Sequence, residues 1–354
     1  MNTSSKEFLR SILEKPSPSG FEKPVATVVR EYMKQFADET RVDTHGNTWG
    51  VLNPKGKIKV MLSGHCDEIG LMVTYISDQG FIAFAAIGGV NVAILQGARV
   101  TVHTKDEDIP GVICVKPIHL MSPEERGKAE TKIQSLWVDI GAKDKKDAER
   151  YVNIGDPMTI NLGFTELLNG NCTSRAFDDR IGSFIVAETL RLLKGKKFAA
   201  AVYAVATVQE EIGLRGATTS TYGIDPDCAI AVDVGFASDC PDVDKKMVGD
   251  IKLGDGPILH RGPNINPVME DLLAKAAKRA KVKTQMQSEP RATGTDANAM
   301  QLSRGGKPAA LVSIPNRYMH SPSEVCNLKD VEDASKLLAQ FILDLKPGQS
   351  FLPW

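Results

Sequence analysis

Short apolar segments alternate with amphipathic helical patterns along most of the chain, and this alternation constrains the fold more than any other feature. Apolar runs at 58–62, 199–208, 228–232 and 309–314 are typical of buried β-strands. Apolar residues at helical spacing predict helices over 25–33, 179–193 and 330–345, and Pro267 is typical of the first position of another helix. Strands that alternate with helices favour an α/β fold with a mainly parallel sheet and helices on both faces.

The segment from 71 to 165 has a different texture. Its apolar runs are short, β-like and punctuated by Gly and Pro, at 81–87, 99–103, 112–115, 136–140 and 158–161. We therefore expect an inserted β-rich domain over 71–165. The flanking segments 1–70 and 166–354 would form the α/β domain, and a length of 354 residues suits two domains.

The composition excludes several classes of partner. Lys and Arg total 43 against 44 Asp and Glu, so the chain has no strong field to attract nucleic acid or an anionic membrane. No apolar stretch reaches the roughly 18 residues of a membrane-spanning helix. The six cysteines are scattered without a C-x-x-C pair, as in reducing compartments, and we expect a cytoplasmic protein.

Acidic and histidine residues gather where the predicted strands end. In an open α/β sheet, sites form outside the carboxyl ends of the strands. The residues at these positions are His65, Asp178, Glu210 with Glu211, Asp233 and His320. Imidazole and carboxylate together suit zinc, cobalt or manganese, and a shared carboxylate would join two ions. A single strand-end Asp more often caps a helix and a lone His is usually structural, so the prediction rests on the convergence.

Two local patterns add roles within this set. On an extended segment, alternation places His65 and Asp67 on one side, so Asp67 can orient the imidazole, although a turn cap is its alternative role. The same alternation points Cys66 away, toward packing. Side chains of the adjacent Glu210 and Glu211 diverge, so one can bind metal while the other serves as a base, unless the pair forms a solvated acidic loop.

Motifs of other enzyme classes are missing from the sequence. It contains no H-E-x-x-H, no Walker A, no G-x-G-x-x-G after a strand and no G-x-S-x-G. Hydride transfer, ATP hydrolysis and serine-nucleophile chemistry are therefore disfavoured.

An ordered set of motifs spans nearly the whole chain and resembles the tetrahedral (TET-type) di-metal aminopeptidases. The motifs are Gly64-His65-Cys66-Asp67-Glu68-Ile69-Gly70, Arg175-Ala176-Phe177-Asp178-Asp179-Arg180, Gln209-Glu210-Glu211-Ile212-Gly213, Asp233, Gly294-Thr295-Asp296-Ala297 and His320-Ser321-Pro322. Members are labelled glutamyl aminopeptidase, deblocking aminopeptidase or, doubtfully, endoglucanase.

The resemblance implies a role for each site residue. One metal would be held by His65, Asp178 and Asp233, and the other by Asp178, Glu211 and His320. Glu210 would be the general base and acid, and Asp67 would support His65. We prefer Asp178 to Asp179 as the bridging ligand, because Asp179 can cap the following helix.

The resemblance also implies a phosphorylase/hydrolase-like fold, two divalent ions per subunit, zinc or cobalt, and a β-barrel-like dimerisation domain over 71–165. Family members commonly form a dodecamer built from dimers. The expected activity is removal of N-terminal residues from peptides by a water activated between the two metal ions and Glu210. The alternatives are a carboxypeptidase or deacylase on the same scaffold, a metal-independent glycoside hydrolase, or a non-catalytic scaffold.

Overall fold

The computed structural model describes residues 1–126 and 132–354 and divides the chain into two compact units. The first unit comprises 1–68, 163–319 and 323–354, and the second comprises 69–162 and 320–322. The predicted assignment of 1–70 with 166–354 to a catalytic domain and of 71–165 to a dimerisation domain stays a prediction.

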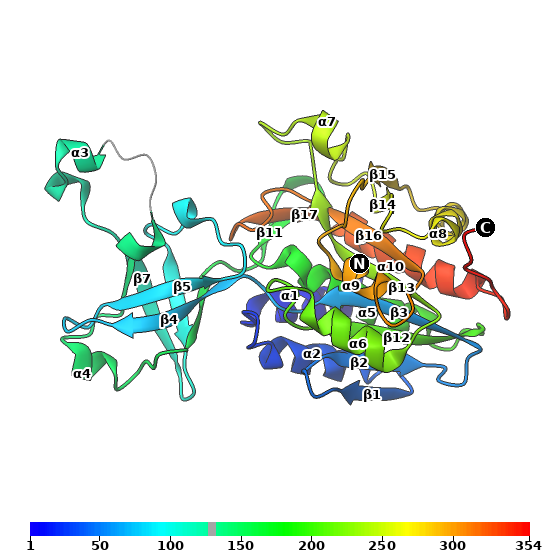
Figure 1. Cartoon of the computed structure of the whole chain (residues 1–354), viewed down its shortest axis with the longest axis horizontal. Coiled ribbons are helices and arrows are strands. Elements are labelled where there is room, and N and C mark those ends of the chain that lie inside the picture. The colour runs from blue at the N-terminus through cyan, green and yellow to red at the C-terminus, as the bar shows by residue number, and fades with distance from the viewer. Residues whose placement is uncertain (127–131) are drawn as a thin grey trace. The chain divides into compact units, whose positions relative to one another are not determined.

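The first unit is built on an eight-stranded sheet with the order β1-β2-β12-β3-β13-β16-β14-β15 (Figure 1). Its four central strands run parallel, which confirms the predicted mainly parallel α/β sheet. The strands are β1 (Glu39–Val42), β2 (Thr48–Leu52), β3 (Ile58–His65), β12 (Ala200–Thr207), β13 (Cys228–Phe236), β14 (Ile258–Arg261), β15 (Gln285–Ser288) and β16 (Ala309–Asn316). A small antiparallel sheet holds β10 (Thr165–Glu166), β11 (Asn171–Ser174) and β17 (Glu324–Asn327).

Two of the strands that carry site residues extend further than their apolar runs predict. β3 continues through His65, and β13 continues through Asp233 to Phe236. The residues added to β3 and the first one added to β13 are polar or small, but they pair with neighbours: His65 lies opposite Thr207 and Asp233 opposite Ser313. Backbone pairing, rather than side-chain hydrophobicity, therefore sets the ends of these strands.

Helices cover both faces of this sheet, as predicted. Successive side chains of a strand point to opposite faces, and Ser63 faces Met300 on α9 whereas a Cβ on Gly64 would meet Gly182 on α5. The helices are α1 (Thr3–Glu14), α2 (Lys23–Met33), α5 (Phe177–Leu193), α6 (Arg215–Ile224), α7 (Lys245–Val248), α8 (Pro267–Ala280), α9 (Asp296–Gln301) and α10 (Leu328–Asp344). α1, α2 and α10 pack on α5, while α6 packs on α9.

The central helix α5 is buried nearly all round rather than on one face. It contacts β3, β12 and β13 on one side and α1, α2 and α10 on the other. Its first turn is irregular: Asp178 and Asp179 have non-helical backbone angles, and the peptide bond between them is cis. The regular helix therefore begins after these two aspartates.

The second unit is a closed barrel with the strand order β4-β5-β8-β7-β6-β9. Its strands are β4 (Gly70–Ile76), β5 (Ile82–Ile87), β6 (Arg99–His103), β7 (Asp108–Cys114), β8 (Trp137–Asp139) and β9 (Pro157–Ile160), with short helices α3 (Pro123–Arg126) and α4 (Lys145–Ala148). Alternate residues such as Val100 and Val102 of β6 fill its separate core. The predicted barrel-like module is thus confirmed as a fold.

Within the described residues, none of the helices combines the length and the apolar character needed to cross a bilayer.

Candidate metal centre

A buried cluster of His65, Asp178 and Asp233 lies at the carboxyl end of β3, in the second half of β13 and at the start of α5. One possible ligand atom from each residue lies within 4.8 Å of the others. His65 Nε2 and Asp178 Oδ1 are 3.1 Å apart. Two ligands at about 2.1 Å from a tetrahedral zinc ion would be about 3.4 Å apart, so these donors fit a divalent metal such as zinc.

The two adjacent aspartates make different hydrogen bonds. The backbone N–H of Asp178 donates to Glu324 Oε2 at 3.0 Å, and the Asp178 side chain faces His65. Asp179 instead accepts from the backbone N–H groups of Gly182 and His65, both at 3.0 Å. Asp179 therefore caps the regular part of α5 and ties it to β3, which leaves Asp178 as the carboxylate directed at the cluster.

Asp67 joins the imidazole of His65 to the loop after β12. Its Oδ1 lies 3.3 Å from His65 Nδ1 and accepts from the backbone N–H of Glu210 at 3.0 Å. Its Oδ2 accepts from the backbone N–H of Glu211 at 3.1 Å and from the hydroxyl of Ser19 at 2.7 Å. Burial alone would raise the pKa of Asp67, but the charge of His65 and these hydrogen bonds hold it below its usual value.

Glu210 lies beside the same cluster, with its Oε2 3.8 Å from His65 Nε2. Burial and, to a lesser extent, the charges of Asp233, Asp296 and Asp178 raise the pKa of Glu210 to about 10, against the lowering by His65. Burial and the charge of Asp178 likewise raise the pKa of Asp233. So many carboxylates in one buried space repel one another unless a cation neutralises them, which suits a site for divalent metal.

Glu211 and His320 occupy different units. Glu211 belongs to the first unit, where its backbone N–H is held by Asp67. His320 follows β16 by four residues and belongs, with Ser321 and Pro322, to the second unit, where its Nδ1 lies 3.0 Å from the carbonyl oxygen of Gly89. Within the first unit, the predicted residues that come together are His65, Asp67, Asp178, Glu210, Glu211 and Asp233.

Three further buried residues lie at this centre, and two of them, Glu324 and Ser19, carry no recognisable local signal in the sequence. Asp296 at the start of α9 accepts from the Thr207 hydroxyl at 2.7 Å, and its charge acts on Glu210. Glu324 holds the backbone of Asp178, and Ser19 holds Asp67. Asp296 lies within a recognised motif, but its place beside the cluster depends on α9 covering β3 and β13.

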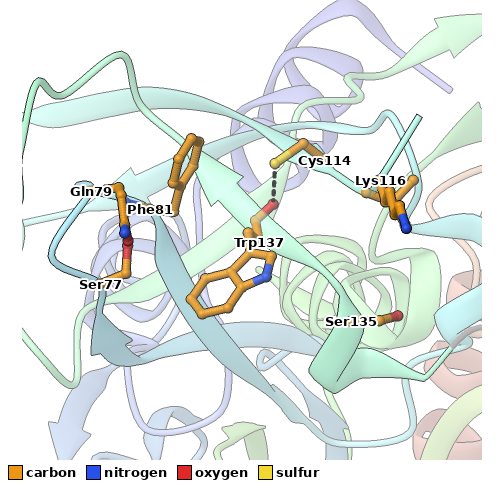
Figure 2. Close-up of a pocket in the computed structure, with 8 residues that line it drawn as sticks. Ser77, Gln79, Phe81, Cys114, Lys116, Ser135 and Trp137 are labelled. Carbon is orange, nitrogen blue, oxygen red and sulfur yellow. Dashed lines mark hydrogen bonds between the residues drawn. The ribbon is translucent and has the colours of Figure 1, made fainter. Parts of the chain in front are cut away.

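The barrel contains a cavity of about 460 Å³ whose lining differs chemically from the metal cluster. Figure 2 shows Phe81, Trp137, Cys114 and Lys116 on its walls, with the Cys114 thiol 3.3 Å from the carbonyl oxygen of Trp137. The lining residues that the structure describes there include no His, Asp or Glu. This cavity therefore has none of the donors that the metal cluster offers.

Comparison with known proteins gives consistent matches over almost the whole chain. Residues 46–337 match the model of the M42 glutamyl aminopeptidase family. The chain is 37% identical over 344 residues to a lysyl aminopeptidase of Pyrococcus furiosus, covering 96% of this chain and 97% of that one.

Solved structures agree with these matches. A TET aminopeptidase from Thaumarchaeota archaeon SCGC AB-539-E09 is similar with a TM-score of 0.92 and 35% identity, over 97% of this chain and 96% of that one. The Pyrococcus horikoshii TET1 peptidase, which can assemble into a tetrahedron or a large octahedral shell, is similar with a TM-score of 0.86 and 29% identity. That match covers 96% of this chain and all of the other.

Proposed function

Because the chain belongs to the M42 glutamyl aminopeptidase family, we propose that its buried cluster is the metal centre of peptide hydrolysis. The chain is a metal-dependent aminopeptidase. The observation that carries the site assignment is the convergence of ligand atoms from His65, Asp178 and Asp233 within 4.8 Å, with Glu210 beside them.

We assign two divalent ions, zinc or cobalt, to this centre. His65, Asp178 and Asp233 would hold one ion, and Asp178, Glu211 and His320 the other, so that Asp178 bridges. Bound divalent ions would lower the pKa of the attacking water and polarise the scissile carbonyl.

Glu210 is the general base in this proposal and later the general acid. Its buried carboxylate beside the cluster can take a proton from the attacking water and deliver it to the leaving amine. Burial and the neighbouring carboxylates raise the pKa of Glu210, and bound cations would lower it, so that the ionised carboxylate could accept the proton. Asp67 fixes both the His65 ring and the backbone of Glu210, and so sets the distance between base and metal.

The oligomer and the location of the protein also belong to this proposal. We propose that the barrel unit serves dimerisation and that dimers build a dodecamer, as the assembly of the Pyrococcus horikoshii relative into a tetrahedron supports. Size-exclusion chromatography with light scattering would give the subunit number. The six free thiols support a cytoplasmic location.

Release of p-nitroaniline from Leu, Ala, Glu and Lys p-nitroanilides by the purified protein tests the function. We expect chelator to abolish the release, and Zn²⁺ or Co²⁺ to restore it. N-acetylated versions of the same substrates are the control, because an aminopeptidase needs the free amino group. Release of p-nitroaniline from acetylated and free substrates at equal rates would instead indicate an amide hydrolase that does not require a free amino group.

A further inference from the structure

The segment between α1 and α2, residues Ser17–Glu22, runs beside the metal centre; we call it the N-terminal strap. It forms a parallel bridge with the residues after β3. The Ser17 hydroxyl donates to the Cys66 carbonyl at 2.6 Å, and the backbone N–H of Glu68 donates to the Ser17 carbonyl at 3.0 Å. The strap therefore follows the backbone of the segment that carries Asp67.

Ser19 makes the first direct contact between the strap and the centre. Its hydroxyl is buried and donates to Asp67 Oδ2 at 2.7 Å. The other donors to this carboxylate are the backbone N–H groups of Glu210 and Glu211. The Ser19 hydroxyl therefore holds Oδ2, while Oδ1 lies between the backbone N–H of Glu210 and the His65 ring.

Glu22 makes the second contact. Its Oε1 accepts from the backbone N–H of Gln209 at 3.1 Å and from that of Gly20 at 2.7 Å. Gln209 has a φ of +55°, a left-handed conformation that is uncommon for a residue other than glycine. One oxygen of Glu22 therefore ties the strap to the residue that orients the following Glu210.

Two buried arginines anchor the helix that precedes the strap. Arg180 donates to the carbonyl oxygens of Ile12 and Leu13 at the end of α1, at 3.0 and 2.9 Å. Arg175 donates to the next two carbonyl oxygens, and both guanidinium groups pair with Glu68. Because these arginines flank Asp178 in sequence, the strap and the ligand-bearing turn are held by one network.

We propose that the N-terminal strap is a positioning element of the metal centre, in which Ser19 acts through Asp67 and Glu22 acts through Gln209. Neither residue touches a reacting atom. Ser19 fixes the carboxylate that aims the His65 ring, and Glu22 fixes the backbone that presents the base. This inference rests on the proposed function for its activity measurements, but the zinc affinity of the first site reports on Ser19 independently.

The test of Ser19 compares three variants of the full chain. Ser19→Ala removes the donor, Ser19→Thr restores a hydroxyl, and Ser238→Ala is the matched control. Ser238 is as buried as Ser19, at 4% exposure, and its hydroxyl bonds the backbone carbonyl and N–H of Ile251. Zinc dissociation constants are measured by competition with a chromophoric chelator, and kcat and KM on the best p-nitroanilide.

We expect Ser19→Ala to weaken zinc binding about 10-fold and to lower kcat more than it raises KM, in line with the effect of partners of metal ligands. The zinc dissociation constant and kcat of Ser19→Thr should stay within about threefold of the wild-type values. Those of Ser238→Ala should stay within about twofold, because no partner of a metal ligand is altered. Zinc affinity in Ser19→Ala equal to that of Ser238→Ala would overturn the role of Ser19, even if the protein cleaved no p-nitroanilide.

Glu22 is tested by Glu22→Gln and Glu22→Ala. Glutamine keeps an oxygen at the position of Oε1, so Glu22→Gln should retain kcat within about threefold of the wild type. In Glu22→Ala, kcat should fall about 10-fold, because the N–H groups of Gly20 and Gln209 lose their acceptor. Wild-type kcat in Glu22→Ala, or an equal loss in both variants, would refute this role for the Glu22 oxygen.

Discussion

Asp67 Oδ1 accepts a hydrogen bond from the backbone N–H of Glu210 at 3.0 Å while lying 3.3 Å from His65 Nδ1. One carboxylate oxygen thus links a metal-ligand candidate to the proposed base, although these two residues are 145 positions apart in the sequence. The position of the His65 ring relative to the backbone of Glu210 therefore depends on this side chain.

Replacing Asp67 by Asn should weaken zinc binding by about 10- to 100-fold, because an amide cannot accept from all of its present donors. Chelator competition measures the zinc affinity. Asp330→Asn is the matched control, since Asp330 is also fully buried and accepts from two backbone N–H groups, of Gly254 and Gly256. Unchanged zinc affinity in Asp67→Asn would contradict the prediction.

Glu210→Gln should lower kcat by about 10²- to 10⁴-fold, the usual contribution of a general base, and should leave the bound metal in place. Metal content by mass spectrometry and kcat on a p-nitroanilide are measured on the same sample. A metal-loaded variant that retained wild-type turnover would assign the proton transfer to another group.

The two adjacent aspartates should respond differently to substitution. Asp178→Ala removes the carboxylate that faces His65 and should reduce the bound metal to less than half of the wild-type content. Asp179→Asn keeps one acceptor for the N–H groups of Gly182 and His65, and should mainly destabilise the fold, by about 1–2 kcal/mol. Metal analysis and thermal unfolding distinguish them, and an exchange of the two phenotypes would make Asp179 the ligand.

Gly64→Ala should destabilise the first unit strongly, because its new Cβ would lie 2.2 Å from the carbonyl carbon of Gly182. Two backbones meet there, so we expect a loss of about 3 kcal/mol or more. Gly223→Ala in α6 meets nothing within 4 Å and should instead stabilise the helix, by up to about 1 kcal/mol. Urea unfolding of both variants checks the predicted opposite signs.

The stability of the protein should depend on pH through Glu22. Burial raises the pKa of Glu22 to about 7 from its usual 4.5, against the lowering by its backbone hydrogen bonds. A carboxyl whose pKa is higher in the folded state stabilises the fold fully below pH 4.5, and this contribution is lost as pH rises through about 7.

Comparison with Glu22→Gln isolates this effect, because the variant cannot titrate at that position. The unfolding free energy of the wild type minus that of the variant should fall between pH 4.5 and pH 8, by at most about 3 kcal/mol. Urea unfolding of chelator-treated samples at several pH values measures this difference. A difference that stays constant or increases with pH would show that Glu22 is not buried in its neutral form.

The sequence contained the local information about this fold. Continuous apolar runs predicted the central strands. Pro267 predicted the start of α8, because the φ that the proline ring fixes suits the first position of a helix. The order of His and acidic residues at the strand ends pointed to one edge of a parallel sheet, since parallel strands end together there. Each of these features depends on residues close in sequence.

The tertiary structure decided which groups meet at the centre. Ser19 reaches Asp67 across 48 residues and Glu324 reaches Asp178 across 146, and neither residue differs in sequence from an ordinary turn or strand residue. β3 and β13 extend through His65 and Asp233 because their backbones pair with neighbouring strands. Hydrophobic periodicity is a property of one segment, whereas the partners of a buried carboxylate depend on strand order and helix packing, which arise only when distant segments come together.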